Sequence, residues 1–277
     1  MTGAAPRSDE QIALERWIGD LHALCPLPLT RPTQICTCED CIAPAKLALL
    51  EDAQIDTIQD NTVSAYFGAA GGPRLSPDQK CEGRFFFVKV LEALGRCVVS
   101  PSPGESTLTR GHWYVEPDYW LSRVFETQFQ ATFSEADSAL VSDYLLFLCR
   151  TACQLGSPRL WDCLEYLGAF TNALENFVAD VRDWPTVHQV AFWSLILGGH
   201  LGTPAAKQGK GFIELHRMAK ILPQQQLPCL INAFGDPRIG RYLERAADRV
   251  RDADMQDFYV RAYVFWSNSV EAMALPR

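Results

Sequence analysis

The sequence predicts an all-α protein, and three observations support this prediction. Apolar residues recur at three- and four-residue spacing through most of the 277 residues, which is the period of a helix with one buried face. Serine, aspartate, proline and glycine interrupt this pattern where helices are expected to begin and end. No stretch is suited to form a sheet. The pattern indicates roughly ten helices, arranged as stacked helix pairs, as in a solenoid, or as one large helical bundle.

The first hundred residues contain four predicted helices. Ser8 and Gln11 form a capping box at the start of the first. The segment from Pro26 to Cys41 is expected to be irregular, because its prolines forbid a continuous helix. The other three helices are expected to begin at proline or N-cap signals near residues 44, 56 and 76.

The rest of the chain contains further predicted helices and two loose connections, at 101–111 and 203–211. Ser134 with Asp137 marks the start of a long apolar helix. The others are expected at about 118–129, 160–181, 185–198, 212–222, 227–234, 237–251 and 253–272. We therefore expect a single elongated helical domain, residues 1–277, with sub-regions 1–100, 112–202 and 212–277.

The composition places the chain among globular proteins. It is 48% hydrophobic and 21% charged, which is far from the disordered class. The most apolar stretch, Val187–Gly199, is too short to cross a bilayer, and the N-terminus lacks an export signature. We therefore expect a cytoplasmic protein whose ten cysteines are not paired in disulfides.

The net charge of −8 is concentrated in the middle of the chain. Residues 101–200 carry 5 basic and 12 acidic side chains, whereas residues 201–277 carry 11 basic and 8 acidic ones. An acidic surface repels nucleic acid and anionic lipid and attracts a basic protein; solubility alone explains it equally well. The carboxylates expected to meet such a partner are Asp162, Glu165, Glu175, Asp180 and Asp183.

A basic stripe follows in the last third. Four arginines recur at three- and four-residue spacing, and acidic residues run alongside them: Arg238, Arg241, Arg245 and Arg249, with Glu244, Asp248 and Asp252. Interlaced charges of this kind usually mark a solvated helix face. Contact with a partner or a second subunit is the functional alternative, and nucleic-acid binding is disfavoured.

The cysteine-rich segment suggests metal chemistry. Cys36, Cys38 and Cys41 stand two and three residues apart, a spacing that lets thiolates close on one zinc ion. Cys25, or alternatively His22, could supply a fourth ligand from the end of the first helix. A structural zinc ion would hold this proline-broken segment in shape, because metal binding contributes to folding.

Two alternatives to a metal site remain open at these cysteines. The thiols could pack as small apolar groups, in which case no cofactor is expected. Cys38 and Cys41 could instead be a redox pair. The redox interpretation lacks the preceding strand of thioredoxin-like proteins, and Glu39-Asp40 would disfavour a thiolate.

The chain resembles a family of uncharacterised bacterial helical proteins over about residues 25–200. The resemblance rests on an Arg-Pro-Thr segment before the close cysteines, a Leu/Ala-rich helix, a Tyr-Phe pair before glycine and an aromatic helix ending in Leu-Glu-x-Leu. These are Arg31–Thr33, Lys46–Leu50, Tyr66–Gly68 and Phe85–Leu94, with looser likeness at Phe133–Glu135 and along the helix around Leu145. Where such proteins have an aromatic inside Cys-x-x-Cys, this chain has Glu39-Asp40. The resemblance implies an α-helical fold and no particular activity.

No catalytic set is visible, since the chain lacks a His-Glu-x-x-His motif, a nucleophile elbow and a phosphate loop. We therefore predict a non-enzymatic helical protein that binds another protein. Its most concrete form is a bacterial immunity-type protein that neutralises a cognate, basic toxin, with no nucleic-acid or membrane partner. A zinc-dependent enzyme or a metal or redox sensor centred on Cys36–Cys41 is the alternative, and a structural scaffold is a third. The oligomeric state is left open.

Overall fold

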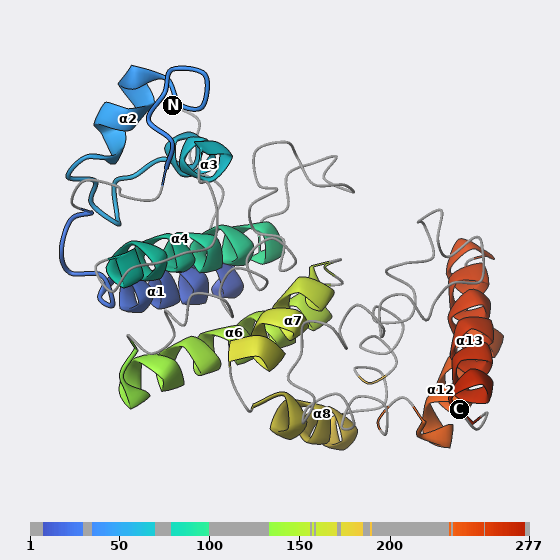
Figure 1. The fold of residues 1–277 in the computed structure, drawn as a ribbon. Coiled ribbons are helices and arrows are strands. Elements are labelled where there is room, and N and C mark those ends of the chain that lie inside the picture. Colours follow the sequence, from blue (N-terminus) through green and yellow to red (C-terminus); the bar gives the residue numbers. More distant parts are fainter. Residues whose placement is uncertain are drawn as a thin grey trace, which may run out of the picture. The chain divides into compact units, whose positions relative to one another are not determined.

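The computed structural model describes most of the chain in separate stretches. These are residues 8–29, 35–69, 79–99, 133–155, 157, 159–170, 173–184, 189, 233, 235–251 and 253–274. Every regular element in them is a helix, so the predicted all-α class is confirmed (Figure 1). No strand occurs within these stretches, where Leu29 and Ala53 form an isolated antiparallel bridge.

The chain divides into two compact units, Met1–Tyr144 and Leu145–Arg277. Helices of the first unit are α1 (Asp9–His22), α2 (Pro44–Leu50), α3 (Asp60–Ala69) and α4 (Gln79–Val99). Helix α6 (Glu135–Leu155) begins in the first unit and ends in the second. The second unit continues with α7 (Leu160–Phe170), α8 (Ala173–Asp183), α12 (Pro237–Arg249) and α13 (Ala253–Ala274). The predicted sub-region boundaries lie outside the described residues, and the choice between stacked pairs and one bundle stays a prediction.

The helix starts predicted at Ser8 and Ser134 are confirmed, whereas α3 begins at Asp60 and not near residue 56. The Ser8 hydroxyl accepts a hydrogen bond from the Gln11 backbone, and the Gln11 side chain accepts one from the Ser8 backbone. Ser134 and Asp137 exchange the same pair of hydrogen bonds before α6. These reciprocal caps satisfy backbone donors that the first turn of a helix leaves unpaired.

One predicted helix is wrong in its extent. The apolar period from 160 to 181 predicts a single helix, but the structure has α7 and α8 as two helices that pack on each other. Each has an apolar face of its own, and Asn172, a residue type favoured before helices, precedes α8. Two short helices bury both faces, whereas one long helix could not fold back on itself. The predicted helices at 118–129, 185–198, 212–222 and 227–234 lie outside the described residues, apart from Gln189 and Ala233.

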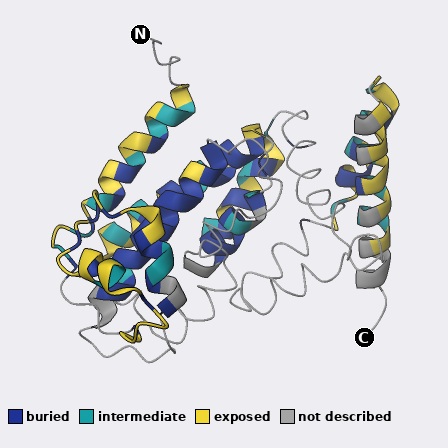
Figure 2. Ribbon diagram, turned by 90° about the horizontal axis from the view of Figure 1, so that it is seen from above, coloured by how far each residue is buried: buried dark blue, intermediate teal, exposed yellow. Residues whose placement is uncertain are grey.

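Helix α4 is the centre of the first unit. Every side chain from Phe85 to Leu94 is buried (Figure 2). Helices α1 and α3 pack against it, and Tyr144 of α6 donates a hydrogen bond to the Leu91 carbonyl oxygen at 2.8 Å. A largely apolar helix that is buried on all sides needs cover on all sides. This explains why the elements that surround α4 come from distant parts of the sequence.

In the second unit, α12 packs along α13 through an apolar face. Ile239, Leu243 and Ala247 are buried on that face. Gly240 allows α13 to approach closely, because a Cβ atom there would collide with the Trp266 ring. Among the described helices, none has the length and apolar character needed to cross a lipid bilayer.

Candidate metal centre

The cysteine loop between α1 and α2 is fixed at both ends. The Leu29 amide donates to the Ala53 carbonyl at 2.8 Å, and the Cys36 amide donates to the Ala69 carbonyl at the end of α3 at 3.0 Å. Ile35 and Ile42, which flank the cysteines, are buried. The loop therefore has apolar anchors on both sides, while the cysteines between them face solvent.

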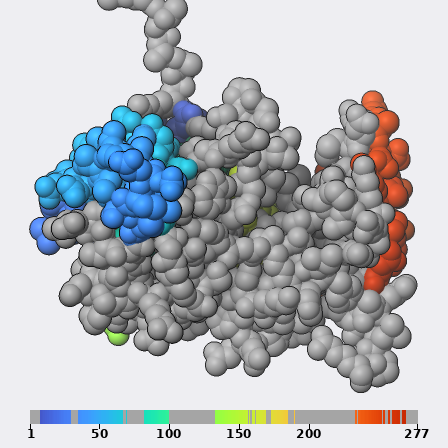
Figure 3. Space-filling model, turned by 45° about the horizontal axis from the view of Figure 1, so that its top comes forward, coloured from blue at the N-terminus to red at the C-terminus, as the bar shows by residue number. Residues whose placement is uncertain are grey.

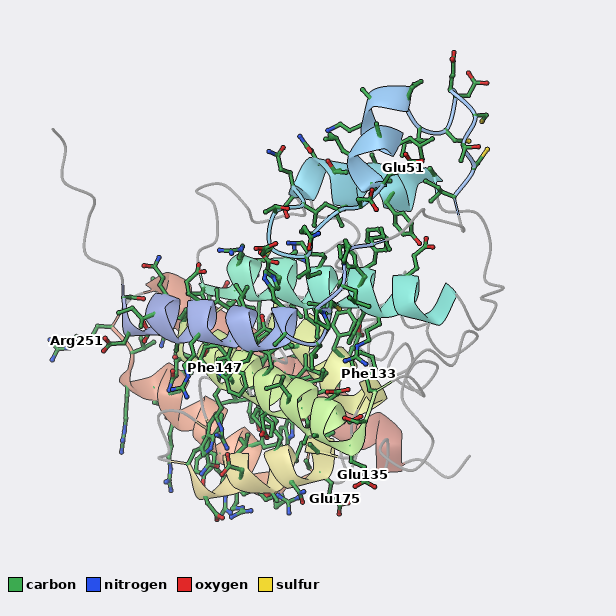
Figure 4. All side chains as sticks on the ribbon, turned by 90° about the vertical axis from the view of Figure 1, so that its left-hand side faces the viewer. Glu51, Phe133, Glu135, Phe147, Glu175 and Arg251 are labelled. Carbon is green, nitrogen blue, oxygen red and sulfur yellow. The ribbon has the colours of Figure 1, made fainter. Side chains whose placement is uncertain are left out.

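A tight turn gathers the three thiols. The amides of Cys41 and Ile42 both donate to the Cys38 carbonyl, at 3.0 and 3.1 Å. This turn brings Cys41 back toward Cys38. The Sγ atoms of Cys36, Cys38 and Cys41 all lie within 4.8 Å of one another, and all three residues are exposed. Figure 3 shows the blue segment that contains this loop on the surface, and Figure 4 shows sulfur atoms at the outside of the loop beside α2.

The geometry is close to that of a zinc–thiolate site. Zn–S bonds of about 2.3 Å in a tetrahedron place sulfur atoms about 3.8 Å apart. Cys36 Sγ donates a hydrogen bond to Cys38 Sγ at 3.1 Å. Shifts of about 1 Å or less in a surface loop would therefore bring the three sulfur atoms to the separations that a zinc ion requires.

Hydrogen bonds favour a thiolate at Cys38. Bonds from the thiols of Cys36 and Cys41, and then from the backbone amides of Cys41 and Asp40, lower the pKa of Cys38 to about 7. The same network, led by the hydrogen bond with Cys38, raises the pKa of Cys41 to about 12. These donors lower the pKa of Cys38 although Glu39 and Asp40 stand next to it in the sequence.

The proposed fourth ligands lie elsewhere. Cys25 is half-buried after α1 and lies outside the group of three donor atoms. His22 Nε2 lies 2.8 Å from Glu92 Oε2. Among the described residues, the cluster thus consists of three thiols, and a fourth coordination position would be open to water or to another molecule's ligand.

No family model, curated protein or solved structure matches this chain. The site is therefore interpreted from its own chemistry. Exposure of all three thiols contradicts the packing alternative at Cys36, Cys38 and Cys41, since packed thiols lie in the core. Among the described residues, the buried thiols are Cys97, Cys149, Cys153 and Cys163, and burial raises the pKa of the last three.

The five carboxylates predicted to bind a partner do not form one surface. Glu165 is buried, with 1% of its surface exposed, so its assignment to an outer face is wrong. It lies among the buried apolar residues of α7, next to Leu164 and Tyr166. Asp162 pairs with Arg159 at 3.0 Å, and Asp180 pairs with Arg150 at 3.0 Å. Glu175 and Asp183 of α8 are exposed; Figure 4 labels Glu175 at the outer side of its helix.

A buried charged cluster was missed by the sequence analysis. Glu92 Oε2 accepts a hydrogen bond from Lys89 Nζ at 2.6 Å and lies beside His22, while Glu92 Oε1 accepts one from Arg96 Nε at 3.1 Å. Lys89 also donates to the Ile55 carbonyl at 3.2 Å. The available signal was a lysine and a glutamate three residues apart within an otherwise apolar stretch. The cluster ties α1 and the α2–α3 segment to α4.

Proposed function

We propose that this chain is a helical protein that binds a thiophilic metal ion, zinc in the first place, at Cys36, Cys38 and Cys41. The observation that supports the proposal is the convergence of three exposed sulfur atoms within 4.8 Å of one another. Thiolates are soft ligands that favour zinc over the hard ions magnesium and calcium. We assign no catalytic role to any side chain at this site.

The role proposed for the ion is to hold the loop in shape. Within residues 35–43, the backbone bonds to itself at the turn from Cys38 to Ile42, and the loop connects α1 with the α2–α3 pair. A metal that binds only the folded loop adds its binding free energy to folding. Removal of the ion by a chelator is therefore expected to lower the melting temperature and to speed amide hydrogen exchange in residues 35–43.

Metal analysis of the purified protein tests the proposal. Protein prepared with reduced thiols and without added metal is expected to contain about one zinc per chain, and Cys38→Ser is expected to lose it. Thr37→Ser is the matched control, because Thr37 is exposed in the same loop and offers no thiol. Cys25→Ser tests the fourth ligand and is expected to retain the ion.

Two outcomes would contradict the metal site. The first is a protein that stays metal-free after zinc is added under reducing conditions. The second is Cys38→Ser protein with an unchanged zinc content. A disulfide that forms reversibly among these cysteines in the metal-free protein, with a measurable reduction potential, would favour the redox alternative instead.

Protein binding through α8 is the second candidate. Glu175 and Asp183 are exposed, and neither forms an ion pair with another described residue. A basic protein could approach these carboxylates, and an immunity-type role toward a basic toxin is the concrete form of this candidate. Protein binding at α8 has less support than the metal site, because Glu165 is buried and Asp162 and Asp180 already pair with arginines.

Affinity capture from the native host tests this candidate. The double variant Glu175→Lys/Asp183→Lys is expected to lose a basic partner that the unmodified protein retains at equal stoichiometry. Asp143→Lys is the control, since Asp143 is an exposed carboxylate on α6. Recovery of no stoichiometric protein, or equal recovery by all three forms, would argue against protein binding at α8.

A further inference from the structure

Helix α12 presents a charged face on the side opposite its contact with α13. Its buried residues are Ile239, Gly240, Leu243 and Ala247. Arg241, Glu244, Arg245 and Asp248 follow one another at spacings of three, one and three residues, so they share one side of the helix. All four are exposed. We call these four residues the charged face of α12.

In the part of the chain that the structure describes, these four charges have no ion-pair partner. Nearby arginines do find partners, since Arg238 pairs with Asp236 and Arg261 with Asp257, both at 2.6 Å. Within the charged face, Arg241 and Arg245 are four residues apart, as are Glu244 and Asp248, and like charges at that spacing oppose each other. Arg241 and Glu244, and likewise Arg245 and Asp248, are opposite charges three residues apart, so attraction and repulsion along the isolated helix largely offset each other.

The order of the charges makes this face complementary to itself. Along α12 the signs run plus, minus, plus, minus, and in the reverse direction they run minus, plus, minus, plus. An antiparallel copy related by a two-fold axis between residues 244 and 245 would place Arg241 opposite Asp248 of the second copy. The same axis would place Arg245 opposite Glu244 of the second copy. Symmetry forms each pair twice, giving four ion pairs from one patch.

We infer that the charged face of α12 is a self-association surface, on which two copies of the chain pair antiparallel. A nucleic-acid backbone or an anionic membrane is a poorer occupant, because two of the four charges are carboxylates and the chain carries a net charge of −8. A different protein would need its own matching charge order, whereas a second copy has it by construction. The inference is independent of the metal site.

The association is expected to be weak and sensitive to salt. Exposed ion pairs gain little individually, and dissolved ions screen them. Self-association measured by sedimentation velocity is expected in about 10 mM salt, where screening is weak and charges interact over about 30 Å, and is expected to disappear near 1 M salt. The whole 277-residue chain, with its thiols reduced, is used throughout.

Charge reversals test the two-fold arrangement. Glu244→Arg alone and Arg245→Glu alone are each expected to weaken self-association about tenfold or more, since each places two like-charged pairs across the axis. The double swap Glu244→Arg/Arg245→Glu is expected to restore it, because the exchanged charges face each other again. Arg251→Glu, an equal charge change at an exposed residue beyond the end of α12, is expected to have little effect.

The double swap decides between a two-fold pairing and a non-specific effect of charge. It has the composition and net charge of the unmodified chain. Restored self-association of the double variant would also show that it folds. A wild-type chain that stays monomeric at low salt would overturn the inference. It would equally be overturned by a double swap as weak as the single variants, or by Arg251→Glu weakening association as much as Arg245→Glu.

Discussion

Glu92→Ala is expected to lower the free energy of unfolding by about 3 to 5 kcal/mol, the range for removing one partner of a buried ion pair. Lys89 is 4% exposed, and its ammonium group lies 2.6 Å from Glu92 Oε2. Without the carboxylate, the buried ammonium group keeps its hydrogen bond to the Ile55 carbonyl but loses its negative partner. Chemical denaturation of the two proteins measures the loss.

Two further variants separate charge from packing at this site. Glu15→Gln is the matched control, because Glu15 also pairs with Arg96 but is 44% exposed; a change within about 0.5 kcal/mol is expected. The double variant Lys89→Met/Glu92→Leu removes both charges and is expected to be more stable than Glu92→Ala. A Glu92→Ala protein as stable as Glu15→Gln would contradict the role of the cluster.

The same carboxylate makes stability depend on pH. Burial by itself would raise the pKa of Glu92, but the hydrogen bond with His22 and the charge and hydrogen bond of Lys89 lower it from 4.5 to about 2. The folded-state pKa is the lower one, so the stabilisation is complete above about pH 5 and is lost as pH falls from 5 to 2. Over this range, wild-type protein is expected to lose about 3 kcal/mol more than Glu92→Gln.

Gly95→Ala is the second substitution with a large expected effect, a loss of about 2 to 4 kcal/mol. A Cβ atom at this position would collide with the Tyr144 hydroxyl and would lie 2.7 Å from Leu14 Cδ1. Tyr144 is fully buried and donates its hydroxyl hydrogen to the Leu91 carbonyl at 2.8 Å. The ring cannot move aside without breaking this bond, so the strain remains in the core.

Gly19→Ala provides the matched control for Gly95→Ala. Gly19 is exposed on α1, and a Cβ atom there would have no neighbour within 4 Å. Alanine restricts the unfolded chain and favours the helix, so a gain of about 0.5 kcal/mol is expected. Thermal unfolding compares both variants. Equal changes of the same sign at both positions would show that close packing around Gly95 does not govern the outcome.

The sequence by itself determined the features that depend on near neighbours in the chain. The capping pairs at Ser8 and Ser134 join residues three positions apart, so residue type fixed them. The thiols of Cys36, Cys38 and Cys41 lie within six residues, and one tight turn is enough to bring them together. The all-α class follows from a helical period that each helix-forming segment carries independently.

Only the tertiary structure decided the features that depend on distant residues. His22 and Glu92 are separated by 70 positions, and Tyr144 reaches Leu91 across 53. The burial of Glu165 and the close approach above Gly95 likewise depend on which helix covers each face. A sequence pattern gives the direction of a side chain on its own helix. The residues that this side chain contacts depend on how distant helices pack, since packing buries apolar surface and brings buried charges into pairs.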